Sequence, residues 1–258
     1  DELAFVMGHE AAHHIAGHIP RQQRNAVTGA LILGGATSLS GVVVSVTGAY
    51  SGDASFAFSN AVGGIAAQTL FLAIADLLHK RANLEHAAAE PANLFQAVLL
   101  LILLSLPIAA MSGPDIAYFG VHPASIALFL AYVWGVRIAG DVSDNPMWKP
   151  VETRETRHDE PEDDHEAGKS ASKPIAVFVV LVAIMGACGF VISQVGGEFI
   201  ERFGLSSSLV GSLVTAVVTS LPEFVTTLVA VRRGALQLAV GGIIGGHTFD
   251  TLFLVFSD

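Results

Sequence analysis

The sequence predicts an all-α, polytopic membrane protein of about seven transmembrane helices that contains an inverted internal repeat, and three observations support this fold class. Only 14% of the 258 residues are charged and 52% are hydrophobic, whereas about 25% of the residues in a soluble globular domain are charged. The apolar residues gather in runs long enough to cross a bilayer, which takes roughly 20 residues. Short motifs from the first third of the chain recur near its end.

The apolar runs follow one another along the chain, and we expect each of them to cross the membrane once. The run that begins at Pro174 holds no charged residue, and the run around Leu99 is nearly as clear. Seven such segments in one short chain disfavour the alternative, which is a set of buried helices in a soluble protein. The predicted spans are 26–50, 55–78, 94–111, 117–138, 174–196, 205–231 and 235–256.

The basic residues sort to one side of the membrane if each predicted span crosses once. Lys and Arg are enriched in the cytoplasmic loops of inserted proteins. With Arg21 and Arg24 placed inside, Arg202 is the single Lys or Arg that falls outside. We therefore expect an integral protein of the bacterial inner membrane whose 141–173 loop lies in the cytoplasm.

The 141–173 segment divides the chain into two membrane halves. It holds ten acidic and five basic residues without apolar periodicity, which is typical of a solvated, disordered linker; a weak regulatory cation site is the alternative. No basic face is present to neutralise phosphates, so we expect the lipid bilayer and inorganic cations as partners and no nucleic acid. The oligomeric state stays open. The expected domains are 1–25, 26–140 with a repeat over 36–76, 141–173, and 174–258 with a repeat over 218–258.

An internal repeat relates the two halves. Thr37-Ser38-Leu39 recurs 182 positions later as Thr219-Ser220-Leu221, and Gly63-Gly64 recurs at the same offset as Gly245-Gly246. Five predicted crossings separate the copies, and because five is odd, the copies enter the membrane from opposite sides. Inverted repeats of this kind build secondary transporters, whose binding site lies near the middle of the bilayer where broken helices of both halves meet.

Two acidic residues, Glu223 and Asp250, lie within predicted spans of the second copy. Ionisable groups at such depth are costly and usually mark an ion or proton path. Pro222 and the paired glycines nearby are expected to break helices and free backbone carbonyls, which are tolerated at depth where they line a cavity. Carboxylates, hydroxyls and carbonyls are hard oxygen ligands that suit Ca²⁺ or Na⁺. The alternative is a pair of neutral acids hydrogen-bonded to a neighbouring helix.

The two copies resemble the α-repeats of the sodium/calcium exchanger (cation/Ca²⁺ antiporter) superfamily over about residues 30–258. The family pattern reads roughly G-[ST]-S-[LIV]-P-E and then G-N-x-x-G-[SG]-N-x-x-[ND]. The second copy reads Thr219-Ser220-Leu221-Pro222-Glu223 and then Gly241-Gly242-Ile243-Ile244-Gly245-Gly246-His247-Thr248-Phe249-Asp250. The first copy aligns with the pattern in part, from Ala36 and from Ser59.

The resemblance implies an antiporter of ten helices in two inverted halves, which moves Ca²⁺ or a related cation against Na⁺ or H⁺ and uses no cofactor beyond these ions. The first helix and the last two of that fold would be missing here, so the chain is expected to be a fragment with a partial exchanger fold. The ion-binding residues that the resemblance implies are Glu223, Asp250, Thr219, Ser220, Thr37, Ser38 and Gln68.

The chain departs from the family pattern mainly in the first copy. The family's ion-binding Glu is Gly41 here, its Pro is Ser40, and its Asn or Asp is Gln68. In the second copy, two Asn positions are Gly242 and His247, and His247 could join the site or be a structural residue. Because fewer carboxylates neutralise less cation charge, the transported ion and the coupling ion both stay open, and a proton-coupled exchanger is among the alternatives.

Residues 1–25 resemble a different family, the HExxH zinc metallopeptidases of the gluzincin type. His9 and His13 are four residues apart, so both imidazoles share one helix face and can hold Zn²⁺, while Glu10 could act as a general base on a bound water. Catalytic zinc takes three protein ligands, and no third ligand with the family's downstream pattern follows. We therefore expect an inactive fusion fragment. A membrane-associated zinc peptidase and a scaffold without transport activity are the alternatives to the antiporter.

Overall fold

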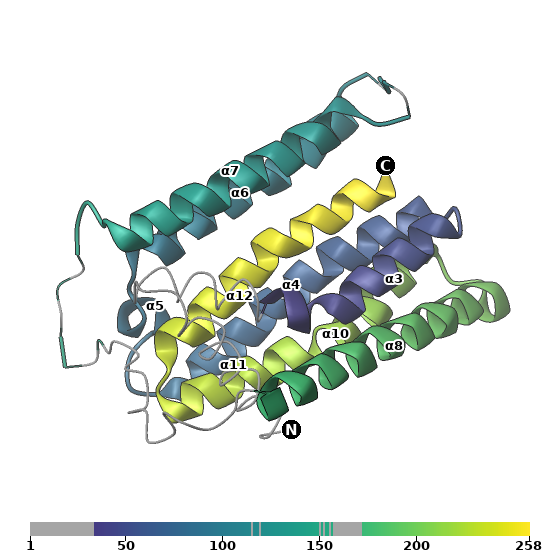
Figure 1. Ribbon diagram of the computed structural model, residues 1–258. Helices are drawn as coiled ribbons and strands as arrows, with labels where there is room; N and C mark the ends of the chain where they lie inside the picture. The colour runs from purple at the N-terminus through teal and green to yellow at the C-terminus, as the bar shows by residue number, and fades with distance from the viewer. Residues whose placement is uncertain are drawn as a thin grey trace.

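The computed structural model describes residues 34–114, 116–118, 120–149, 151, 153, 154, 156 and 172–258. Almost all of this part of the chain is helical, and its only strand-like pairing is an isolated bridge between Tyr118 and Val121. The long helices form an elongated bundle, with the α6–α7 hairpin on one side and α8 on the other (Figure 1). The all-α prediction is therefore confirmed.

Five of the predicted spans are long apolar helices. They are α4 (Ala54–His79), α6 (Pro91–Ser112), α7 (Pro123–Asp144), α8 (Ser172–Phe203), and α12 (Leu236–Asp250) with its 3₁₀ continuation η2 (Thr251–Ser257). By length and composition, five helices of the described chain can cross a membrane, and a sixth can if one bent pair counts as a single span.

Three span boundaries differ clearly from the prediction: the start of α7, the end of α7, which lies at Asp144 and not at 138, and the end of α8. The run predicted over 117–138 becomes helical only at Pro123, because the Tyr118–Val121 bridge and the left-handed Gly120 (φ 83°) form a tight turn before it. The run predicted over 174–196 continues as helix to Phe203. Its last turns carry Glu198 and Arg202, which form an exposed i,i+4 ion pair.

The predicted span 205–231 is a broken helix. It consists of α9 (Ser207–Leu209), a π-helix η1 (Val210–Thr215), α10 (Ala216–Thr219) and α11 (Leu221–Arg233), with a bend of 40° at Ser220. Pro222 lies in the first turn after the bend, and its missing N–H leaves the carbonyl of Val218 without its helical donor. The predicted break in this span is confirmed.

The predicted span 26–50 is broken in the same way. The chain is helical over 34–37, turns at Ser38, and resumes as α3 (Leu39–Tyr50), while residues 26–33 lie outside the described residues. Ser38 and Ser220 occupy equivalent positions of the repeat, and the ψ angle of each is close to 0° (−4° and −1°). Downstream, Gly52 (φ 80°) and Gly234 (φ 83°) are also equivalents, and both adopt the left-handed conformation that favours glycine. The repeat therefore holds for the backbone as well as for the sequence.

The two copies are oppositely oriented. From its break, α3 runs towards one end of the bundle and α11 towards the opposite end, and α4 and α12 likewise run antiparallel (Figure 1). At one end, Ser207 Oγ donates to Asp53 Oδ2 at 2.6 Å. At the other end, the short helix α5 (Leu84–Ala87) packs against Val231. The chain reversals thus gather into the two groups that the charge pattern assigned to opposite sides of the membrane.

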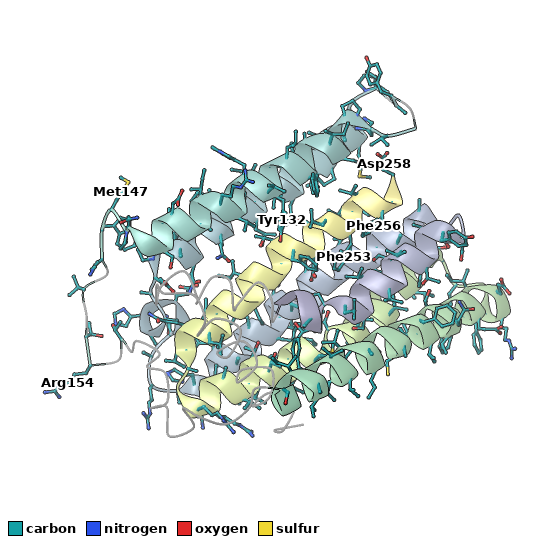
Figure 2. All side chains as sticks on the ribbon, viewed as in Figure 1. Tyr132, Met147, Arg154, Phe253, Phe256 and Asp258 are labelled. Carbon is teal, nitrogen blue, oxygen red and sulfur yellow. The ribbon has the colours of Figure 1, made fainter. Side chains whose placement is uncertain are left out.

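Burial decreases from the centre of the bundle outwards. The most apolar window of α12 is 67% buried, whereas those of α6 and α8 are 17% and 6% buried. Side chains project outwards along α6, α7 and α8 (Figure 2), and many of these are large and apolar, such as Leu101 and Val179. Apolar surface outside and buried polar groups inside are expected of a protein whose solvent is lipid.

Glycines allow the inner helices to approach closely. A Cβ atom built on Gly63 of α4 would lie 2.5 Å from the carbonyl oxygen of Ser212 in η1. A Cβ atom on Gly189 of α8 would lie 2.6 Å from the carbonyl oxygen of Ser40 in α3. Small residues at such crossings are the usual means of packing helices in a membrane, and here they bring α8 and η1 against the two central helices of the first copy.

Candidate functional site

A cavity lies where the two broken helices face each other. Its empty volume is about 230 Å³, and its wall comes from α3, α4, the α10–α11 break, α12 and η2. Six of the seven predicted ion-binding residues line it, all except Thr37. The lining residues are Ser38, Gly41, Asn60, Ala61, Gly64, Gln68, Thr219, Ser220, Glu223, Asp250 and Phe253.

Both acidic residues are buried in this wall, with exposed fractions of 5% for Glu223 and 3% for Asp250. Glu223 lies in the first turn of α11, where the positive end of the helix dipole favours a carboxylate. Asp250 is the last residue of α12, at the point where the helix tightens into η2. The second copy therefore supplies both carboxylates from places where its helices change geometry.

The first copy supplies a hydrogen-bond donor to each carboxylate. Ser38 Oγ donates to Glu223 Oε1 at 3.2 Å, and Gln68 Nε2 donates to Asp250 Oδ2 at 2.8 Å. Gln68 and Asp250 are repeat equivalents, 182 residues apart, so this second bond joins the two copies at matching positions. Each donor engages one oxygen of its carboxylate, which leaves the other oxygen available.

Three buried acceptor oxygens around the cavity have no hydrogen-bond partner in the described part of the chain. They are Glu223 Oε2, Asp250 Oδ1 and Gln68 Oε1. An unpartnered buried polar group costs about 1–3 kcal/mol, and a charged one costs more. Because all three atoms accept and none donates, a positive charge is the species that would satisfy them together. Hard oxygen ligands of this kind suit Ca²⁺, Na⁺ or a proton and not a soft metal.

Ser40 gives the departure from the family's proline a structural account. Its Oγ donates to the carbonyl oxygen of Thr219 at 3.1 Å, across the interface between the two copies. Ser40 occupies the position equivalent to Pro222. A proline there would have no donor, so the substitution adds a bond to a buried carbonyl at the opposite break.

Gly41 occupies the first-copy position that is equivalent to Glu223. A Cβ atom at Gly41 would meet the ring of Phe253 at 3.6 Å and Thr219 Oγ1 at 3.8 Å, which are ordinary contacts. Gly41 therefore has room for a Cβ atom beside Phe253, and because Gly41 lines the cavity, a longer side chain would have to extend into it. The site is chemically one-sided because the first copy contributes no carboxylate to it.

Asn60 is a site residue that the sequence analysis did not single out. Its Nδ2 donates to the carbonyl oxygen of Gly41 at 3.2 Å and to Ser45 Oγ at 3.0 Å, and Thr215 Oγ1 donates to its Oδ1 at 2.8 Å. The amide thus ties α4 to α3 and to the π-helical segment η1. An Asn within the apolar first-copy motif was the available signal, since a buried amide needs partners.

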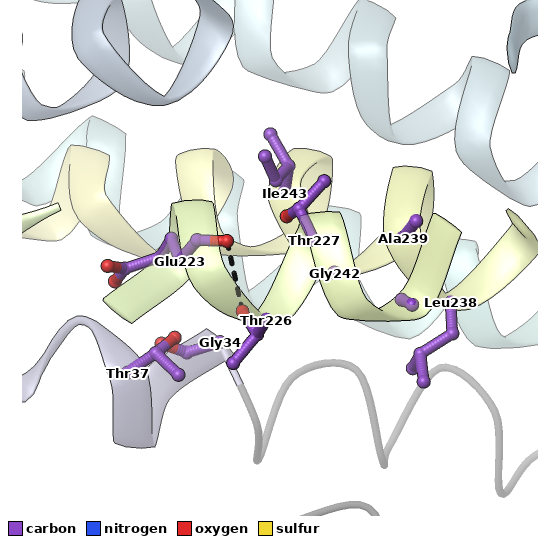
Figure 3. Close-up of a pocket in the computed structure, with 10 residues that line it drawn as sticks. Gly34, Thr37, Glu223, Thr226, Thr227, Leu238, Ala239, Gly242 and Ile243 are labelled. Carbon is purple, nitrogen blue, oxygen red and sulfur yellow. Dashed lines mark hydrogen bonds between the residues drawn. The ribbon is translucent and has the colours of Figure 1, made fainter. Parts of the chain in front are cut away.

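Glu223 also borders a second cavity, which is shown in Figure 3. This cavity has an empty volume of about 320 Å³, and it extends from Glu223 along α11 and α12 past Thr227 towards Ala239. Thr37 lines it together with Gly34, so the seventh predicted ion-binding residue lies beside Glu223 but outside the first cavity. Thr226 Oγ1 donates to the carbonyl oxygen of Glu223 at 3.0 Å.

The remaining candidates do not join the site. His247 is buried, but it lines neither cavity, and its Nε2 has no partner in the described part of the chain. The predicted zinc ligands His9 and His13 and the predicted base Glu10 lie outside the described residues. Within those residues no group of three or more His, Cys, Asp or Glu side chains could hold a metal ion.

Comparison with known families identifies a match over both halves. The model of the sodium/calcium exchanger protein family matches residues 7–138 and 173–255. The first of these segments includes His9, Glu10 and His13, so the prediction of a separate metallopeptidase-like fragment over residues 1–25 finds no support.

Curated relatives are similar over shorter stretches. The sodium/calcium exchanger MaX1 of Methanosarcina acetivorans is 36% identical over 72 residues, which make up 28% of this chain and 20% of the relative. The inner membrane protein YrbG of Escherichia coli is 38% identical over 53 residues, which make up 20% of this chain and 16% of the relative. The chain thus spans at most a fifth of the length of the curated relatives it matches.

Solved structures share the fold over nearly the whole chain. The sodium-calcium exchanger NCX_Mj superimposes with a TM-score of 0.58 at 19% sequence identity, covering 99% of this chain and 75% of the other. A second structure of the same exchanger gives a TM-score of 0.57 at 21% identity. At these identities the similarity concerns the fold, and it confirms the predicted partial exchanger architecture.

Proposed function

Because this chain belongs to the sodium/calcium exchanger protein family, we propose that it is a secondary active cation antiporter in which Glu223 and Asp250 bind the transported ion. The cargo is Ca²⁺ or a related cation, and the counter-ion is Na⁺ or H⁺. Thr219, Ser220, Ser38 and Gln68 complete the site, and Thr37 lies on the route to it. The transporter functions in a membrane, with the lipid bilayer around α6, α7 and α8.

One observation carries this proposal. Three buried oxygens without a hydrogen-bond partner belong to Glu223, Asp250 and Gln68, which all line one cavity, while the second oxygen of each carboxylate already accepts from a neutral donor. A pair of merely structural acids would be expected to have all its oxygens satisfied. The arrangement supports a site that is complete only when a cation enters it.

The two helix breaks supply the moving parts of the proposed mechanism. Glu223 borders both cavities. An ion bound to Glu223 in the first cavity would therefore lie next to the second cavity, which extends along α11 and α12 and provides a path to the site. Rocking of the helix pairs α3–α4 and α11–α12 about Ser38 and Ser220 would close this path and open the opposite one, as alternating access requires. We place the α5 end of the bundle in the cytoplasm of a bacterial cell, following the distribution of Lys and Arg.

Transport by the reconstituted protein tests the proposal. Liposomes that contain the purified protein and an inward-directed Ca²⁺ gradient should take up Ca²⁺ when Na⁺ or H⁺ is supplied inside. Glu223→Gln keeps the size of the side chain and removes its charge, and we expect it to reduce the exchange rate at least about 100-fold. Glu198→Gln makes the same change at an exposed residue of α8 and should retain exchange. Wild-type exchange by Glu223→Gln would refute the assignment.

A further inference from the structure

The cavity between the two broken helices is lined by few ionisable side chains, so its charge can be counted. Among the described residues that line it, only Glu223 and Asp250 are ionisable, and the neighbouring cavity adds no other charged side chain. The equivalent positions in the first copy are occupied by Gly41 and Gln68, which are neutral. With both carboxylates ionised, the empty site therefore carries two negative charges.

Net charge in such a place is strongly disfavoured. Both carboxylates are more than nine-tenths buried, and an uncompensated ion in a low-dielectric interior costs several kcal/mol even after relaxation. The hydroxyl of Ser38 and the amide of Gln68 are neutral donors, so they orient the carboxylates without cancelling their charge. A load of two positive charges makes the occupied site neutral, whereas a load of one or three leaves an unpaired charge.

From this count we propose that every loaded state of the transporter carries two positive charges and that its exchange is electroneutral. One divalent cation binds Glu223 and Asp250 and crosses as a neutral complex, and two monovalent cations, either Na⁺ or H⁺, replace it and return as a neutral complex. No net charge moves in the full cycle. This inference rests on the proposed antiport function and specifies its stoichiometry.

The membrane potential tests the inference directly. In liposomes with K⁺ and valinomycin, the potential is set to zero or to about 100 mV of either sign, and the steady-state ratio of Ca²⁺ inside to outside is measured with a fixed Na⁺ or H⁺ gradient. We expect the same ratio at all three potentials. A cycle that moves one net charge would change the ratio about 50-fold per 100 mV.

The outcomes separate this inference from the function on which it rests. Exchange that responds to the potential would overturn electroneutrality while leaving the antiporter intact. Absence of any cation-driven Ca²⁺ uptake would overturn the proposed function and the stoichiometry with it. Exchange that ignores the potential supports both.

Gly41 offers a matched pair of variants that change only the charge count. The space beside it accepts a Cβ atom, and the rest of the side chain would enter the cavity. Gly41→Glu adds a third carboxylate, which a load of two positive charges leaves unpaired, so we expect it to exchange at least about 10-fold more slowly than Gly41→Gln, which adds nearly the same volume without charge. Equal exchange rates of the two folded variants would contradict the charge-counting argument. If neither variant folds, the wild-type measurement decides alone.

Discussion

The two repeat copies share a backbone plan but divide the chemistry unequally. Both break at an equivalent serine, Ser38 or Ser220, and both end their first helix before a left-handed glycine. Yet the second copy carries both carboxylates, while the first contributes neutral donors and the glycine at position 41. The comparison shows that two features can vary independently. These are the helix breaks that form the cavity and the charged side chains that line it.

The largest effect is expected when a charge is moved from one copy to the other, which tests whether the unequal division of the carboxylates matters for transport. Asp250→Asn should reduce exchange at least about 100-fold, since it removes half of the site's charge without changing its size. Adding Gln68→Glu to that variant restores two carboxylates at equivalent positions and should recover part of the rate. Initial rates in liposomes check both results. No recovery in a folded double variant would show that the two positions are not interchangeable.

Alanine substitutions at two equivalent glycines should lower the stability of the protein by different amounts, and this effect is smaller than the effect of moving a charge. Gly63→Ala would place its Cβ 2.5 Å from a backbone oxygen, so we expect a loss of stability of about 1–3 kcal/mol. At Gly245, the equivalent position, an added Cβ would meet only Gln96 Oε1 at 3.4 Å, and the loss should be smaller. Thermal unfolding in detergent compares the two. Equal losses would contradict the asymmetry in helix packing.

The left-handed glycines should instead behave alike. Gly52 and Gly234 have φ of 80° and 83°, a region that costs other residues about 1–2 kcal/mol. Replacement of either by alanine should therefore lower the stability by similar amounts in the same unfolding assay. A marked difference between these two variants would mean that the helix ends are not held in the same way.

Removal of the hydrogen bond from Ser40 should have the smallest effect of these four sets of variants. Ser40→Ala removes the donor to the carbonyl of Thr219, and a typical buried hydrogen bond contributes about 1 kcal/mol. Ser105→Ala at an exposed position of α6 removes only a bond within its own helix and serves as the control. If the two variants are equally stable, the Ser40 bond does not hold the copies together.

Much of the fold was predictable because its signals are local. Apolar length identified the spans that became α4, α6, α7, α8 and α12, and the odd number of crossings between the motifs implied their opposite orientation. One boundary error with a clear cause is the start of α7, where a tight turn at Gly120 precedes the helix within a run of apolar residues. The peptidase-like interpretation of residues 1–25 rested on a short match to the HExxH motif, and a match over so few positions is weakly specific.

The site was predictable in its acids and less so in its neutral partners. Glu223 and Asp250 stood out because carboxylates are rare in apolar spans. The role of Ser40, the contacts of Asn60 and the position of Thr37 in the second cavity were not visible in the sequence. Hydroxyl and amide side chains are common in such helices, so their presence does not indicate which backbone or carboxylate they reach.

The sequence by itself determined the membrane spans, the inverted repeat and the two buried acids, because hydropathy, periodic motifs and charge are properties of short stretches of chain. Only the tertiary structure decided that Gln68 donates to Asp250 and Ser38 to Glu223, which leaves one oxygen of each carboxylate without a partner in the wall of one cavity. Those bonds join residues more than 180 positions apart, so they exist only where the helices of both copies pack against each other.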